Sequence, residues 1–91
     1  MELEKIPFSA DSFASYKRYR EAVDEFHTKL YRGKRVEFAH ELIGESGSVM
    51  HKKGRRVKII DVDCGMIRVR DSYGVPIRSL FKPQAFNLIE P

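Results

Sequence analysis

The stretch between His51 and Lys58 holds the residues best suited to binding a polyanion. It reads His-Lys-Lys-Gly-Arg-Arg-Val-Lys. A tight turn at Lys53-Gly54 predicts a hairpin tip from which basic side chains reach phosphates, and each neutralised phosphate releases counterions. The predicted nucleic-acid contacts are Lys52, Lys53, Arg55, Arg56 and Lys58, supported by Arg32, Lys34 and Arg35. A solubilising hairpin with charged edges would have the same composition, so both interpretations stay open.

A second set of cations falls on predicted outward positions further along the chain. Arg68, Arg70 and Arg78 alternate with apolar residues on neighbouring stretches. With Tyr73 they could form another binding face, on which the tyrosine ring stacks on a base. Ordinary alternation on a half-exposed sheet produces the same pattern, and we favour that interpretation.

The sequence contains residue types that catalysis uses, but they are not spaced as a catalytic site requires. Asp61 and Asp63 could share acid–base work or hold a metal, yet pairing with nearby arginines or capping the Cys64-Gly65 turn explains them better. The three histidines lack metal-ligand spacing. Cys64 has no activating cation beside it in the sequence. We therefore expect no enzyme, no catalytic residue, no metal and no cofactor.

The positive charge is concentrated in one part of the chain. The net charge is +4, and residues 32–58 alone hold eight basic and three acidic side chains. A localised excess is a better indication of a polyanionic partner than a high isoelectric point. The excess therefore points to the same segment as the basic stretch.

Cysteine content and hydropathy indicate the compartment. Cys64 is the only cysteine, so an intramolecular disulfide is impossible, which favours a reducing, cytoplasmic setting. The N-terminus has no apolar run of the secretory type. No stretch approaches the roughly 18 apolar residues that span a bilayer, so no membrane association is expected.

A helix is the first element that the hydrophobic pattern predicts. Residues 1–10 form an extended lead-in, and the helix covers residues 11–32, with Ser9 and Asp11 offering caps. Residues 11–31 contain no glycine or proline, and Gly33 is a natural stop. The apolar stripe with helical spacing comprises Phe13, Tyr16, Val23, Phe26 and Leu30.

After Gly33 the apolar residues no longer recur at helical spacing but at every second position. Short alternating runs lie around Val36, Val49, Val57, Ile67 and Val75, and a last run follows at 86–89. Turn residues separate them at intervals of about 8–12 residues, which is typical of a small barrel or sandwich. The sequence therefore predicts one α+β domain over residues 1–91. Its N-terminal amphipathic helix packs on a five- or six-stranded antiparallel β-barrel formed by residues 33–91.

Two motifs within this β region resemble those of a known family. Gly33-Lys34-Arg35-Val36 followed by Leu42-Ile43-Gly44-Glu45-Ser46-Gly47-Ser48-Val49 resembles the KOW motif. The end of the chain, from Arg78 to Ile89, resembles the close of a KOW- or Tudor-type barrel, where a strand leads through a short 3₁₀ turn into a final strand. The resemblance covers nearly all of residues 33–89. It implies RNA or DNA association, or association with a polymerase.

Two functions follow as expectations. The first is a non-catalytic nucleic-acid-binding barrel that contacts phosphates through its basic hairpin. The alternative is a small protein-binding adaptor or inhibitor of the phage or mobile-element type, which docks on a host protein such as a nucleic-acid-processing machine. A helix of about 20 residues is roughly 30 Å long, so part of it could overhang the barrel and bind a partner or form a homodimer.

Overall fold

The computed structural model of the chain describes residues 1–89. One helix, α1 (Tyr16–Tyr31), precedes six strands: β1 (Arg35–Phe38), β2 (Leu42–Ile43), β3 (Val49–His51), β4 (Arg56–Asp63), β5 (Met66–Arg70) and β6 (Phe86–Leu88). Short 3₁₀ turns lie at Ala10–Ser12 and Pro83–Ala85. The α+β class and the order of helix before strands are confirmed. Residues 90–91 of the predicted β region lie outside the described residues.

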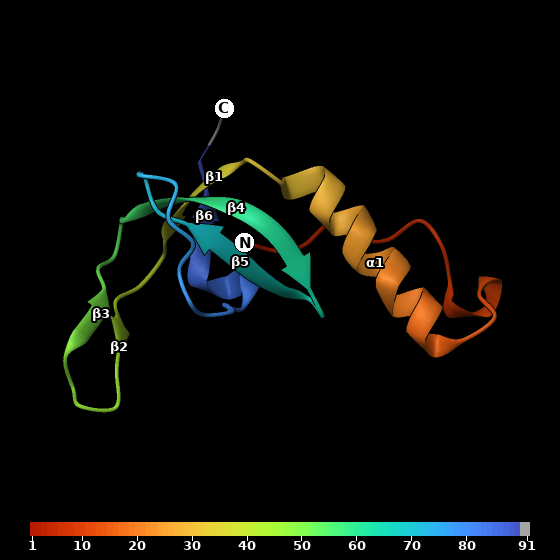
Figure 1. Ribbon diagram of the computed structural model, residues 1–91, viewed down its shortest axis with the longest axis horizontal. Helices are drawn as coiled ribbons and strands as arrows, with labels where there is room; N and C mark the ends of the chain where they lie inside the picture. The colour runs from red at the N-terminus through yellow and green to blue at the C-terminus, as the bar shows by residue number, and fades with distance from the viewer. Residues whose placement is uncertain (90–91) are drawn as a thin grey trace.

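The strands form two antiparallel sheets. One has the order β5-β4-β1-β6, and the other pairs β2 with β3. Figure 1 shows the β2–β3 hairpin and α1 at opposite ends of the molecule. The backbone pairing of residues 1–89 gives these two sheets and no closed barrel, so the barrel prediction is not confirmed. None of the helices in this part of the chain has the length and apolar character needed to cross a bilayer.

The Lys53-Gly54 turn does not form the tip of a hairpin, so this prediction was wrong. β3 pairs with β2 and β4 pairs with β1, which places residues 52–55 at the junction of the two sheets. The turn is tied to β1, because Gly54 N–H donates to Phe38 O and Phe38 N–H donates to Arg55 O. The tip of the hairpin is at residues 44–48 instead, where Gly44 N–H donates to Ser48 O.

The helix starts later than predicted, and of the predicted apolar stripe only Val23 is fully buried. Ser15 caps it by accepting from Arg18 N–H, and Gly33 follows its end in the left-handed region, as its role as a stop requires. Its buried residues are Val23, His27 and Tyr31, whereas Tyr16 of the predicted stripe is 71% exposed.

The lead-in covers part of the predicted stripe. It folds back along α1, and the ring of Phe8 packs edge-on against those of Phe13, Tyr19 and Phe26. Two hydrogen bonds also hold the lead-in against α1. Glu4 N–H donates to Tyr31 Oη at 2.9 Å, and His27 Nε2 donates to Glu4 O at 2.8 Å. The first residues are thus a packing layer between helix and sheet, which a helical period alone cannot reveal.

Alternation builds the core under the four-stranded sheet. Every second residue of β1 and β5 is buried, Val57, Ile59 and Val62 of β4 are buried as well, and Phe81 and Phe86 complete the core. The register of β4 on β5 shifts between Ile59 and Asp61, which leaves Ile60 as the extra residue of a β-bulge. Beyond the bulge α1 covers the edge of β4, because Thr28 Oγ1 accepts from Val62 N–H and donates to Val62 O.

The strand expected around Val75 is absent from the described residues. Only a single bridge joins Pro76 to Arg70. Proline cannot donate to a ladder, so the segment leaves the sheet edge after one contact. The short strand at 86–88 is present, and it pairs with β1 rather than with its neighbour in sequence.

Candidate nucleic-acid interface

Basic side chains line up across the outer face of the four-stranded sheet. Lys58 of β4 lies directly opposite Arg35 of β1 on one side and opposite Arg70 of β5 on the other. All three are exposed, and they alternate with residues buried in the core. Alternation therefore turns the three cations to the same face, away from the core. We call Arg35, Lys58 and Arg70 the basic row.

A groove of about 220 Å³ lies beside the basic row. It is lined by Arg35, Arg56, Val57, Lys58 and Ser72. Arg56 lies opposite Glu37 of β1, the one acidic residue in this part of the register. Among residues 1–89, neither Arg56 nor any member of the basic row has a carboxylate oxygen within 4.0 Å. Like charges on neighbouring strands repel each other, and an anion bound between them would relieve that repulsion.

We call residues 52–55, which join β3 to β4, the junction turn. It carries Lys52, Lys53 and Arg55 and precedes Arg56. Arg55 Nη1 donates to His51 Nδ1 at 2.7 Å, and the His51 ring stacks on Phe38 with 4.7 Å between ring centres. Burial, and then the charge of Arg55, lower the pKa of His51 below its ordinary value. The imidazole is therefore neutral near pH 7 and free to hold Arg55 in place by accepting its hydrogen bond.

His51 should make the folding stability depend on pH. In the unfolded chain its pKa returns to the ordinary value of 6.5, so on acidification the unfolded state takes up the proton first. Stability is then lost as the pH falls from about 7 through this value toward the lowered pKa of the folded state. Urea unfolding from about pH 7 to about pH 5 should show a smaller loss in His51→Gln than in the wild type. His40→Gln is the matched control because His40 is exposed; equal pH profiles for the wild type and His51→Gln would contradict the expectation.

The three supporting residues from the helix end line one groove, although Arg32 has other contacts as well. Lys34 and Arg35 line a groove of about 230 Å³ with Arg32, Leu88 and Ile89. Arg32, however, donates from Nε to Ile60 O and also lines the acidic groove between α1 and β4. The structure brings Arg35, Arg56 and Lys58 together and places residues 52–55 next to them, while Arg32 is partly directed elsewhere.

Arg70 is a member of the basic row that the sequence pattern grouped instead with Arg68 and Arg78, on a face interpreted as ordinary sheet surface. The available signal was its outward position on β5, which it shares with Arg68. The two arginines differ in their surroundings. Arg68 forms ion pairs with Asp61 at 3.6 Å and Asp63 at 3.3 Å, as the sequence led us to expect of these carboxylates, whereas Arg70 forms none within residues 1–89.

The opposite end of β4 is acidic. A groove of about 520 Å³ between α1 and β4 is lined by five carboxylates together with Thr28, Lys29, Arg32 and Val62; the carboxylates are Glu21, Asp24, Glu25, Asp61 and Asp63. Four of these carboxylates are in ion pairs with Arg20, Lys29 or Arg68, whereas the basic row has no carboxylate partner within residues 1–89, so a nucleic acid would be attracted to the basic row. The charge distribution thus gives a bound strand one preferred face.

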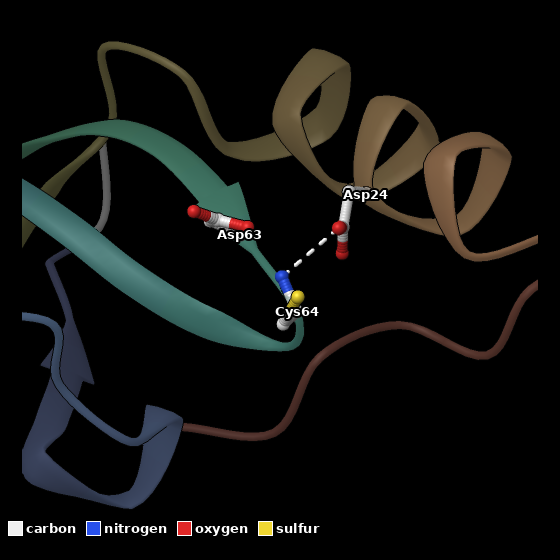
Figure 2. Close-up of side chains that lie close together, drawn as sticks. All are labelled: Asp24, Asp63 and Cys64. Carbon is white, nitrogen blue, oxygen red and sulfur yellow. Dashed lines mark hydrogen bonds between the residues drawn. The ribbon is translucent and has the colours of Figure 1, made fainter. Parts of the chain in front are cut away.

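Three potential metal ligands meet where α1 reaches the β4–β5 turn. Figure 2 shows Asp24 of α1 pointing at this turn, with Asp63 and Cys64 beside it. Asp24 accepts from Cys64 N–H at 2.9 Å and from Gly65 N–H at 3.4 Å. Cys64 is in the left-handed region with φ of 52°. The Asp24 carboxylate therefore satisfies the backbone of a strained turn, which is a structural role.

The surroundings of Cys64 suppress its reactivity. A hydrogen bond to Asp63 and the charge of that carboxylate raise the pKa of the exposed thiol above its ordinary value. The thiolate is the nucleophile, so iodoacetamide should alkylate Cys64 more slowly at about pH 8 than it alkylates a free cysteine derivative. Asp63→Asn should raise the alkylation rate, and Asp71→Asn in a distant loop serves as control. An unchanged rate in Asp63→Asn would show that the carboxylate does not govern the thiol.

The basic row and the adjoining groove lie together on β1, β4 and β5, and the junction turn leads into Arg56 at the start of β4. The site is defined by charge and exposure rather than by a buried catalytic group. Comparisons with family models, curated proteins and solved structures found no match for this chain.

Proposed function

We propose that this protein binds nucleic acid without catalysing a reaction, through the outer face of its four-stranded sheet. The observation that carries the proposal is the basic row, three cations in register on neighbouring strands with no carboxylate partner among residues 1–89. The phosphate contacts are Arg35, Lys58 and Arg70 together with Arg56, and the junction-turn residues Lys52, Lys53 and Arg55 extend the surface. Lys34 and Arg32 contribute from the end of α1.

The dimensions of the row suit a phosphate backbone. Neighbouring strands are about 4.8 Å apart, so the row spans about 10 Å. Duplex DNA carries one phosphate per about 3.4 Å of axis on each strand, so a row of this length can contact more than one phosphate. The acidic groove between α1 and β4, at the opposite end of β4, favours the same orientation because its lining holds more carboxylates than cations.

We also infer that the sheet is the body of a small barrel of the KOW or Tudor type. The chain after β5 returns to its edge, where Ile67 and Phe81 exchange two backbone hydrogen bonds of 2.7 and 2.9 Å. It then passes through the 3₁₀ turn at Pro83–Ala85 into β6, which pairs with β1 at the other edge of the sheet. This path supports a curled sheet. The connection from β5 to β6 runs from one edge of the sheet to the other and covers both.

A charge-reversal pair of variants tests the proposed function. Arg35, Lys58 and Arg70 are changed to Glu in one variant, and Lys5, Lys17 and Arg18 are changed to Glu in the other. All six residues are exposed, and both variants change the net charge equally. Binding to labelled oligonucleotides should be lost in the first and largely kept in the second. Equal loss in both would mean that net charge alone attracts the ligand, and equal retention would exclude this surface.

A second candidate function is docking on another protein, and the β2–β3 hairpin favours it. Ile43, Val49 and Met50 are 63%, 45% and 59% exposed on this projecting hairpin, next to the basic junction turn. An apolar pocket with an acidic rim on a nucleic-acid-processing protein would suit both features.

The partner and the nucleic acid can be separated experimentally. Ile43→Ser with Met50→Ser should lose a stoichiometric partner captured from nuclease-treated lysate, while oligonucleotide binding stays unchanged. Light scattering on the purified chain distinguishes a second copy, including a homodimer through α1, from a foreign partner. Capture that survives both substitutions would rule out docking through the hairpin.

A further inference from the structure

The loop that follows β5 is held in one tight conformation by Asp71. The Asp71 carboxylate accepts from Tyr73 N–H and from Val75 N–H, both at 2.9 Å. The Asp71 backbone donates to Val75 O and accepts from Gly74 N–H, and Gly74 is in the left-handed region with φ of +84°. The bridge between Arg70 and Pro76 closes the base of the loop. The loop is therefore a preformed turn rather than a loose connection.

Tyr73 lies at this turn and is 92% exposed. Its backbone is fixed by Asp71, so the ring stands out from the surface without being packed on the core. Within residues 1–89 its ring has no aromatic neighbour, in contrast to Tyr19, whose ring contacts Phe8 and Phe13. An isolated exposed aromatic is ordinary by itself. Its position relative to the basic row is what gives it significance.

The loop places Tyr73 beside the basic row. Ser72, the residue before it, lines the same groove as Arg35, Arg56 and Lys58. Arg70, which begins the loop, is opposite Lys58 in the register. Consecutive α-carbons are 3.8 Å apart, so the backbone of Tyr73 is one residue away from the lining of this groove. A flat apolar ring and a row of cations thus belong to neighbouring chain positions.

We propose that Tyr73 stacks on an unpaired base, and that the ligand of this face is single-stranded nucleic acid. The inference rests on the proposed function, because the basic row must hold the phosphates that bring the base to the ring. In a duplex the faces of the bases are covered by their neighbours, whereas a single strand can offer one to an aromatic side chain. Arg35, Lys58 and Arg70 hold the backbone, and Tyr73 selects an unstacked strand.

The test compares ligands and tyrosine variants by fluorescence anisotropy. The ligands are a labelled oligo(dT) and oligo(U), each about 12 nucleotides long, and a DNA duplex of the same length. Tyr73→Ala removes the ring, Tyr73→Phe keeps its face, and Tyr16→Ala removes a tyrosine that is 71% exposed at the start of α1. Circular dichroism melting verifies that each variant is folded. We expect the Tyr73 variants to keep the loop, because Asp71 bonds to the backbone of residue 73 rather than to its side chain.

The wild type should bind the single strands more tightly than the duplex. Tyr73→Ala should weaken single-strand binding by about 5- to 150-fold, which corresponds to the energy of stacking one base. Tyr73→Phe and Tyr16→Ala should bind the single strands like the wild type, and duplex binding should not change in Tyr73→Ala.

The two proposals fail in different ways. Unchanged single-strand binding in Tyr73→Ala would overturn stacking while leaving the basic row in place. Equal losses in Tyr73→Phe and Tyr73→Ala would assign the effect to the hydroxyl and overturn it as well. If the wild type binds none of the three ligands, the proposed function itself is wrong.

Discussion

Lys58→Glu is expected to lower the affinity for a single-stranded oligonucleotide by about 10- to 100-fold, the cost of losing a charge-assisted contact. Lys58 is the middle member of the basic row, opposite both Arg35 and Arg70. A glutamate there removes one cation and supplies a carboxylate that can pair with either neighbour. Anisotropy titration at low salt measures the effect directly.

Two further variants define what the Lys58 result means. Lys58→Gln removes the charge without reversing it, so its loss should be smaller than that of Lys58→Glu. Lys17→Glu on α1 makes the same change of net charge at an exposed position away from the sheet, and it should bind nearly like the wild type. A Lys58→Glu variant that binds like Lys17→Glu would mean that the sheet face does not contact the ligand.

Phe38→Ala should have the largest effect on stability, lowering the free energy of unfolding by about 3–5 kcal/mol. Phe38 is 1% exposed, and its ring packs against Phe81, Phe86 and His51. Phe38 therefore connects the core of the four-stranded sheet to β3, the strand that precedes the junction turn. Domains of this size are stable by about 5–15 kcal/mol, so the loss would be a large part of the total.

Urea unfolding followed by circular dichroism measures the loss in Phe38→Ala. Val75→Ala is the matched control, because Val75 is 56% exposed and lies outside the strands. The control should change the free energy of unfolding by less than about 0.5 kcal/mol. A change below about 1 kcal/mol in Phe38→Ala would contradict the central place of this ring in the core.

Alternation along the chain was sufficient to predict the strands that carry the basic row. Val36, Val57, Ile67 and Val69 were expected to alternate with charged residues, and all four are buried. The rule is reliable here because side chains on a strand point to opposite faces in turn. For the same reason the exposure of Arg35 and Lys58 could be expected from the alternating pattern alone.

The register between strands could not be predicted, because it depends on the bulge at Ile60. The two-residue turn pairs Asp63 with Met66, and a regular ladder continued from there would set Lys58 opposite Asp71. The extra residue shifts the pairing by one and sets Lys58 opposite Arg70 instead. No single residue type marks this bulge, so neither Arg70 as a neighbour of Lys58 nor the basic row was visible in the sequence.

Long-range pairing also decided where the junction turn lies. Lys53-Gly54 has the composition of a hairpin turn, but the strands on its two sides each pair with a different partner. Likewise His27 became part of the buried helix face because the lead-in supplied Glu4 O as its hydrogen-bond acceptor. Both outcomes depend on contacts between segments far apart in the chain, which local patterns do not encode.

The dependence of affinity on salt tests most directly whether the basic row binds phosphates. The logarithm of the association constant for a labelled single strand is measured against the logarithm of the salt concentration, from about 50 to about 300 mM KCl. Four phosphate contacts predict a slope of about −3 for the wild type, and Lys58→Glu should have a slope shallower by at least about 0.7. A flat slope, or the same slope in both proteins, would contradict the proposal.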